Sequence, residues 1–216
     1  IMYLYYRLKA LHLEKLNEDS AVPGLNRETA YSQTFGLPSI EEQKRIASIL
    51  SFLDEKIETN KLINDNLEKQ AQAIFNEICM PISDKTVDNM QELVLSDIID
   101  VRDGTHDSPK RTEKGKYLIT SRHLMSNGTI DFENAYKISD VDFETINKRS
   151  GVDNNDILYS MIGTIGNILL VNQYKINFAI KNMALFKTSK DKPLSYFLYL
   201  YLKSDFIRNY IDSRKA

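Results

Sequence analysis

Cysteine, tryptophan and histidine are scarce in this chain of 216 residues. It has one cysteine, Cys79, no tryptophan, and three histidines. A single cysteine excludes an intramolecular disulfide framework and leaves no thiolate cluster for zinc. His12, His106 and His123 do not stand at metal-ligand spacings, so we expect no metal site and no cofactor.

Long apolar runs are also missing. No run approaches the roughly 18 residues that a membrane helix requires, and no charged-then-apolar signal segment opens the chain. Hydrophobic residues make up 42% and charged residues 27%, which is ordinary for a soluble globular protein with a buried core. We therefore expect a cytoplasmic protein without a membrane partner.

The familiar catalytic motifs are absent too: no G-x-S-x-G, Walker loop or H-E-x-x-H occurs. MIGTIGNI, with Gly163 and Gly166, resembles part of a phosphate-binding loop, but that site needs a helix N-terminus and the following residues favour a strand. We predict a tight hairpin turn there. Asp140 and Asp142 fall in an acidic segment typical of a solvated loop. The chain is expected to be non-catalytic.

Charge is segregated along the chain. The net charge of -2 argues against a uniformly basic nucleic-acid binder. Residues 102–123 nevertheless contain six basic against three acidic residues, whereas residues 131–156 are acidic. Within the basic segment, DGT leads into HDSPKRTEKGK, which is too polar to pack. We predict an exposed basic loop.

One long segment has the pattern of an uninterrupted helix. Between Pro38 and Pro81 there is no glycine or proline. Ser39 followed by Glu42 matches a capping box, in which both side chains satisfy backbone donors of the first turn. Pro81 cannot continue a helix and disfavours helical geometry just before it. The sequence predicts a helix of roughly 39 residues, about 58 Å long.

Residues along this helix repeat at alternating steps of four and three, the heptad pattern of a coiled coil. Two asparagines interrupt the apolar seam, and a buried amide fixes register when it meets another across the interface. Two alternatives are a helix packed on its own domain and, because Ile49, Phe52 and Ile63 widen the face, a larger helix assembly. The predicted interface consists of Ile46, Leu50, Leu53, Ile57, Asn60, Asn64, Leu67, Ala71, Ile74 and Ile78.

The two ends of the chain resemble each other. YLYYRLKALHLEKL, from Tyr3, aligns with FLYLYLKSDFIRNY, from Phe197, at an offset of 194 residues. Both segments predict amphipathic helices, so chance similarity remains an alternative to a true repeat. A true repeat means that the chain covers one repeat unit plus a short overlap.

After the helix, short apolar runs alternate with turn residues. The runs LVLSDIIDV, KYLITS, GTIDF, DILYSMIGTIGNILLV and NMALFK predict strands, and Tyr196 to Ile211 predicts a closing helix. The predicted fold class is α+β: a long coiled-coil helix joined to an α/β domain of mixed short strands and helices.

The helical segment carries a resemblance to a known family. LPSIEEQKRIASILSFLDEKIETN, preceded by SAVPGLNRE, resembles the central conserved region of specificity subunits of type I restriction-modification enzymes. There a Leu-Pro, a Glu-Gln pair (Glu42-Gln43), an Arg-Ile-Ala (45–47) and a Leu-Asp (53–54) open a long helix. DILYSMIGTIG and DGTHDSP are similar to the family's glycine hairpin and loop.

In that family, two target-recognition domains alternate with two such helices, which pair antiparallel as a molecular ruler, and each domain reads half of a split DNA sequence. The resemblance implies a non-catalytic subunit that binds double-stranded DNA, while modification subunits methylate adenine and restriction subunits translocate and cut. The absence of the adenine methyltransferase motif N-P-P-[YF] agrees with this expectation.

The sequence departs from the family in being about half as long, with the second helix missing. We expect the tail of a preceding recognition domain at 1–37, the conserved helix at 38–80, a linker at 81–91 and a recognition domain at 92–216. One hypothesis is an antiparallel homodimer through residues 41–79, in which residues 22–37 complete the partner's domain. Residues 1–22 would then duplicate 195–216. Alternatively, another specificity chain supplies the second half.

DNA contacts are expected from polar side chains on loops, with Lys and Arg on phosphates and other polar groups at base edges. The phosphate candidates are Lys110, Arg111, Lys114 and Lys116. The candidates for base contacts are Thr105, His106, Ser121, Arg122, His123, Ser160, Met161 and Thr164.

Two other function classes stay open. A coiled-coil adaptor whose domain binds protein, without DNA specificity, agrees with the acidic total charge. A nuclease with scattered carboxylates has little support in the sequence.

Overall fold

The computed structural model describes residues 1–16, 26–79, 94–163 and 165–214, so the predicted linker at 81–91 lies outside the described residues. The chain divides into two compact units, residues 1–66 and residues 67–216. The expected α+β class is confirmed, since the chain contains a 39-residue helix, shorter helices and two β-sheets. The four domain boundaries remain predictions.

The first unit is helical. In it α1 (Met2–Ala10), η1 (Leu13–Leu16) and α2 (Arg27–Tyr31) precede the first part of α3 (Ile40–Ile78). The phenol of Tyr6 on α1 donates hydrogen bonds to the carboxylate of Asp54 at 2.7 Å and to the hydroxyl of Ser51 at 3.3 Å. Side chains one position after the predicted seam therefore hold α1 on α3.

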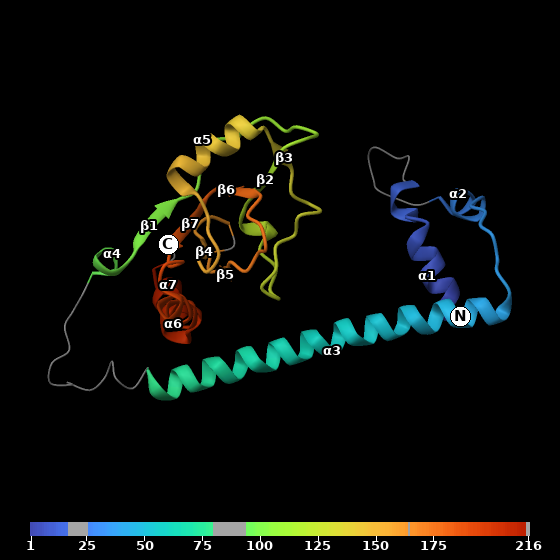
Figure 1. Cartoon of the computed structure of the whole chain (residues 1–216), viewed down its shortest axis with the longest axis horizontal. Coiled ribbons are helices and arrows are strands. Elements are labelled where there is room, and N and C mark those ends of the chain that lie inside the picture. Colours follow the sequence, from blue (N-terminus) through green and yellow to red (C-terminus); the bar gives the residue numbers. More distant parts are fainter. Residues whose placement is uncertain (17–25, 80–93, 164, 215–216) are drawn as a thin grey trace. The chain divides into compact units, whose positions relative to one another are not determined.

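Helix α3 begins and ends where the sequence predicts, and it is unbroken (Figure 1). The hydroxyl of Ser39 accepts a hydrogen bond from the backbone N–H of Glu42 at 3.3 Å, which is the expected first half of the capping box. The carboxylate of Glu42 pairs with the guanidinium of Arg45 at 2.8 Å. The cap thus forms mainly through the serine.

The second unit contains two sheets. The antiparallel sheet has the strand order β1-β7-β4-β5, and the mixed sheet has the order β3-β2-β6 with β2 parallel to β6. The strands are β1 (Asp100–Asp103), β2 (Lys116–Ile119), β3 (Lys137–Ile138), β4 (Ile157–Ser160), β5 (Ile168–Leu170), β6 (Phe178–Ile180) and β7 (Met183–Lys187). The helices are α4 (Leu95–Ile98), η3 (Ser121–His123), α5 (Asp140–Ser150), α6 (Lys192–Lys203) and α7 (Asp205–Asp212).

Alternating side chains of the strands build three apolar layers. Between the sheets lie residues such as Ile119, Leu158 and Phe178, all fully buried. On the other face of the mixed sheet, Leu118 packs with Ile146 of α5, and on the other face of the antiparallel sheet, Ile157 packs with Leu198 of α6. Helices α5 and α6 therefore cover opposite sides of the paired sheets (Figure 1).

Four local predictions were wrong. The run LVLSDIIDV is not one strand, because Leu95–Ile98 form helix α4 and β1 begins only at Asp100. The closing helix is two helices, because Ser204 has extended backbone angles and caps α7. GTIDF forms no strand and contributes only an isolated bridge between Leu124 and Ile130. Asp140 and Asp142 lie in the first turn of α5, where carboxylates are favoured by the helix dipole, rather than in a loop.

The last turns of α3 pack on α6 within the second unit. Glu68 accepts hydrogen bonds from the phenol of Tyr199 at 2.7 Å and the ammonium of Lys203 at 2.5 Å. The ring of Phe75 meets that of Phe197 edge to face, with centroids 5.3 Å apart. Like Ser51 and Asp54, the α3 side chains Glu68 and Phe75 follow a predicted seam position by one residue. The stripe next to the seam therefore binds both α1 and α6.

The seam itself is largely exposed. Leu53, Ile57, Leu67, Ile74 and Ile78 each keep 47–62% of their surface accessible, and Asn60 and Asn64 are also exposed. Ile46, Leu50 and Ala71 are half-buried. The alternative in which α3 packs on its own domain accounts for the neighbouring stripe but leaves the seam uncovered.

Candidate nucleic-acid interface

The parallel strands β2 and β6 end side by side, and a short polar segment follows each of them. Their register pairs Ile119 with Ile180, and the N–H of Lys181 donates to the carbonyl of Ile119 at 2.9 Å. Residues 120–123 continue from β2, while Lys181 and Asn182 form the turn between β6 and β7. Because carboxyl ends of parallel strands share one sheet edge, these polar residues gather there.

The basic loop after β1 is fastened to the same edge. The N–H of Gly104 donates to Met183 at 2.8 Å, that of Thr105 to Ile180 at 3.0 Å, and that of Asn182 back to Thr105 at 3.1 Å. Position 104 must be glycine, because a Cβ there would lie 2.8 Å from the carbonyl oxygen of Ile180. The sequence correctly predicted that this loop is exposed beyond residue 105. It did not predict the backbone hydrogen bonds that attach the start of the loop to the β6–β7 turn.

The short helix η3 contacts the β4–β5 hairpin. The hydroxyl of Ser121 donates to the carbonyl of Ile162 at 3.2 Å. Antiparallel pairing of β4 with β5 and positive φ angles at Gly163 and Gly166 confirm the predicted hairpin turn. Thr164 lies outside the described residues. The predicted DNA contacts on η3 therefore lie next to those described on the hairpin.

His123 is a structural residue of η3. Its ring is 2% exposed, and its Nδ1 accepts the N–H of Thr120 at 2.9 Å. Burial lowers the pKa of His123, and the nearby charge of Arg122 lowers it further. The neutral ring therefore favours a positioning role over a direct DNA contact.

A hollow of about 400 Å³ lies beside η3 and brings two arginines together. The guanidinium of Arg111 stacks over the ring of Tyr136, 4.9 Å from its centroid. Arg122 lines the same hollow, whose other lining residues are His123, Asp131 and Asn134. Guanidinium groups suit bidentate recognition of phosphate or of guanine edges.

The residues predicted to contact DNA differ in how exposed their side chains are. His106, Lys110, Arg111, Lys114 and Arg122 are exposed. Lys116, Ser121 and Met161 are half-buried, and Lys116 lies 3.9 Å from the carboxylate of Asp140. Thr105 and Ser160 are buried: their hydroxyls accept the N–H groups of Asp107 and Asn167. Burial favours a structural role for these two.

Lys181 and Asn182 are polar residues of this edge that sequence reasoning missed. The ammonium of Lys181 donates to the hydroxyl of Ser108 at 2.5 Å, and the amide oxygen of Asn182 lies 2.9 Å from Nδ1 of His106. The sequence signal was weak: an asparagine between the apolar runs FAI and MALFK is compatible with a turn, because asparagine tolerates the left-handed region.

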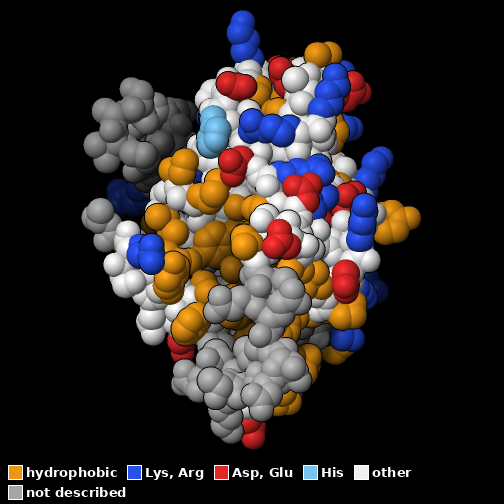
Figure 2. All heavy atoms as spheres, turned by 90° about the vertical axis from the view of Figure 1, so that its left-hand side faces the viewer, with side chains coloured by type: hydrophobic (Ala, Val, Ile, Leu, Met, Phe, Trp, Pro, Cys, Tyr) orange, Lys and Arg blue, Asp and Glu red, His pale blue; other side chains and the backbone are white. Residues whose placement is uncertain are grey.

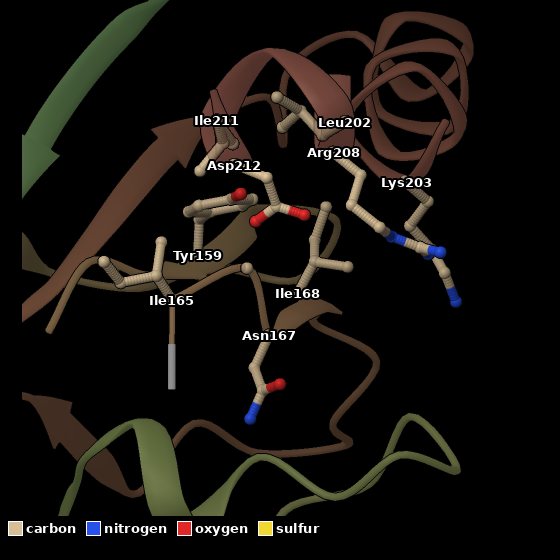
Figure 3. A pocket seen from close by; sticks show the side chains of 10 residues that line it. Tyr159, Ile165, Asn167, Ile168, Leu202, Lys203, Arg208, Ile211 and Asp212 are labelled. Carbon is tan, nitrogen blue, oxygen red and sulfur yellow. The ribbon is translucent and has the colours of Figure 1, made fainter. Parts of the chain in front are cut away.

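A second cavity, of about 310 Å³, lies between the β4–β5 hairpin and helices α6 and α7 (Figure 3). Its two cationic side chains are already paired: Lys203 with Glu68 at 2.5 Å and Arg208 with Asp205 at 3.3 Å. Burial and the charge of Asp212 raise the pKa of Tyr159, which stays a neutral phenol. This cavity offers less to an anionic ligand than the arginine-lined hollow.

The described part of the chain shows neither a cluster of metal ligands nor a helix that could cross a membrane. No group of three or more His, Cys, Asp or Glu residues is arranged to hold a metal ion among the described residues. None of the helices in these ranges is long and apolar enough to cross a membrane.

Comparisons with known proteins match most of this chain to one family. A family model described as "Type I restriction modification DNA specificity domain" matches residues 1–69 and 87–213. The chain is 27% identical over 227 aligned positions to the type I restriction enzyme MjaIX specificity subunit of Methanocaldococcus jannaschii, covering 93% of this chain and 51% of that protein.

Solved structures give a similar result. The type I restriction-modification S subunit from M. genitalium superposes with a TM-score of 0.51 at 17% identity, covering 99% of this chain and 56% of that one. The HsdS subunit from Thermoanaerobacter tengcongensis gives a TM-score of 0.37 at 16% identity, covering 94% and 54%. The first likeness shows a shared fold. The chain spans about half the length of the relatives it matches.

Proposed function

The chain belongs to the family of type I restriction-modification DNA specificity domains, and from this membership we propose that it recognises one half of a bipartite DNA sequence. Residues 92–216 act as the target-recognition domain. The chain performs no chemistry of its own: modification subunits methylate adenine, and restriction subunits translocate and cut the DNA.

The observation that carries this proposal is the convergence of polar loops at the carboxyl ends of β2 and β6. The β6–β7 turn is hydrogen-bonded to the basic loop and to Ile119 at the end of β2, just before η3, and η3 contacts the β4–β5 hairpin through Ser121. Reading DNA requires polar side chains held on a rigid support, and a sheet edge provides one.

Within this surface, we assign different roles by charge and exposure. Lys110, Arg111, Lys114 and Lys116 contact phosphates, which gives affinity without sequence information. His106, Ser121, Arg122 and Met161 face the bases, and Thr164, which lies outside the described residues, stays a predicted base contact. Thr105, His123 and Ser160 hold the loops in place.

We assign α3 the role of spacer and assembly surface. Its exposed apolar seam runs along most of the helix, beside the stripe that binds α1 and α6. An antiparallel partner helix, from a second copy or from another specificity half, would cover this seam and pair Asn60 or Asn64 with amides across the interface. Two DNA-reading domains would then stand at a fixed separation.

Exposed apolar surface also supports the second candidate, a coiled-coil adaptor without DNA specificity. Besides the seam, hydrophobic side chains gather on the face shown in Figure 2, and Leu95 and Ile98 of α4 and Val101 of β1 are 40–46% exposed. Such patches are typical of contacts with other polypeptides.

Selection from a random duplex DNA library, with the protein alone and with its modification subunit, separates the two functions. Enrichment of a defined short motif supports DNA recognition. Recovery of a random set of sequences by a correctly assembled complex contradicts it and favours the adaptor.

A further inference from the structure

The β6–β7 turn holds an asparagine in a conformation that usually selects glycine. Asn182 has a φ of +55°, in the left-handed region. Glycine adopts this region without steric cost, and asparagine is tolerated there. Only asparagine brings a side-chain amide, which here meets the ring of His106 rather than its own backbone.

The backbone around this pair is fixed on both sides. The carbonyl of Thr105, just before His106, accepts the N–H of Asn182, and the N–H of Thr105 donates to Ile180. The guanidinium of Arg149 donates to the carbonyl of Gly104 at 2.9 Å. His106 is therefore an exposed side chain on a rigid support, unlike the buried His123.

The contact between the two side chains determines what the ring offers to a ligand. With the amide oxygen of Asn182 2.9 Å from Nδ1, the proton of a neutral ring lies on Nδ1. The other nitrogen, Nε2, then carries a lone pair and accepts hydrogen bonds. In the major groove, the exocyclic amino groups of adenine and cytosine are the matching donors.

Resting on the proposed function, we infer that His106 reads an adenine or a cytosine through Nε2 and that Asn182 is the positioning residue that sets its tautomer and orientation. This assigns a specificity-determining role to a turn residue outside the basic loop. Lys181, bonded to Ser108, supports the far side of the same loop.

Library selection with four variants tests this inference. Asn182→Gly keeps the left-handed turn but removes the acceptor for Nδ1, and His106→Ala removes the reader. Both should relax the preference at the same single base pair of the motif, by roughly tenfold. Asn182→Asp keeps an acceptor for Nδ1 but adds a negative charge that favours the imidazolium, whose Nε2 donates, so it should change the preferred base pair at that position rather than merely relax it.

Asn155→Gly is the matched control, because Asn155 is also an asparagine with a positive φ, of +67°. It should leave the motif unchanged. A motif unaffected by Asn182→Gly and His106→Ala overturns this inference alone, as does relaxation of different positions by the two variants, or an equal loss at every position. An unaltered protein that enriches no motif overturns the proposed function as well.

Discussion

The ammonium group of Lys187, at the end of β7, is hydrogen-bonded to the carboxylate of Asp156, which is fully buried just before β4. Asp156 also accepts the N–H groups of Asp153 at 2.7 Å and Ser189 at 3.1 Å. Lys187 makes a second ion pair, with the exposed carboxylate of Asp153 at 2.7 Å. These bonds fix the strand that leads into the β4–β5 hairpin.

Replacing Asp156 by Asn should lower the free energy of unfolding by about 3 kcal/mol, because it leaves the charge of the poorly exposed Lys187 without its buried partner. Urea denaturation followed by circular dichroism measures this change. Asp153→Asn is the matched control and should cost less than about 1 kcal/mol, since that carboxylate is exposed. Equal losses in the two variants would contradict the role of burial.

Glu68 should make the docking of α3 on α6 dependent on pH. Burial raises the pKa of Glu68, but hydrogen bonds from Lys203 and Tyr199 and the charge of Lys203 outweigh it, so the pKa is lowered overall. A lowered pKa in the folded state stabilises the protein above the unfolded pKa of about 4.3, and this contribution is lost as the pH falls through the folded pKa.

The variant Glu68→Gln should therefore be less stable than the unaltered protein at pH 7, by about 1 kcal/mol or less, because the group is partly exposed. The difference should shrink as the pH falls below about 4. Thermal unfolding of both proteins across this range measures it, and a difference independent of pH would contradict the ionic contribution.

Charge removal in the basic loop should weaken binding to all DNA sequences. The double variant Lys110→Gln with Arg111→Gln should lower the slope of log K against log salt by about 2, one unit for each phosphate contact. The double variant Lys148→Gln with Lys190→Gln removes the same charge elsewhere. Equal slopes in the two double variants would remove this loop from the interface.

Arg122 should contribute to sequence discrimination. Because Arg122 is an exposed residue of η3 that lines the hollow at the candidate interface, Arg122→Ala should cost about 1–3 kcal/mol of affinity on the recognised sequence and little on random DNA. Competition binding on the two DNAs measures the difference. An equal loss on both would identify Arg122 as a phosphate contact.

The exposed seam of α3 predicts self-association or pairing with another specificity half. Ile57→Lys places a charge in the seam at a site that is already 53% exposed, so the variant should fold normally but lose the pairing. Thr59→Lys adds the same charge away from the seam. Sedimentation equilibrium of the two variants measures whether the pairing is lost. A complete complex that contains one copy of the unaltered chain and no other specificity half would contradict the pairing.

Local signals predicted the long helix and the hairpin well. The cap at Ser39, the break at Pro81 and the heptad steps all act within a few residues, and so do the positive φ angles of Gly163 and Gly166. Helix α5 was missed although Ser139 caps it through Asp142, because its few apolar residues, such as Ile146, show their burial only against the sheet.

The candidate interface was predicted only in part for the same reason. Charge and turn composition pointed to the basic loop, whose exposed Lys and Arg side chains are where they were expected. The anchor at Lys181 and Asn182 depends on the parallel pairing of β2 with β6, two strands far apart in the sequence. Likewise, the burial of Thr105 and His123 follows from tertiary packing that composition does not indicate.

The most direct test of DNA recognition is to co-express the protein with its modification subunit and to map every methylated adenine in the host DNA. We expect methylation at one defined split sequence. A palindromic split site indicates two identical reading domains on paired α3 helices, and an asymmetric site indicates a second specificity half. A complex that assembles but methylates no defined sequence would contradict the proposed function.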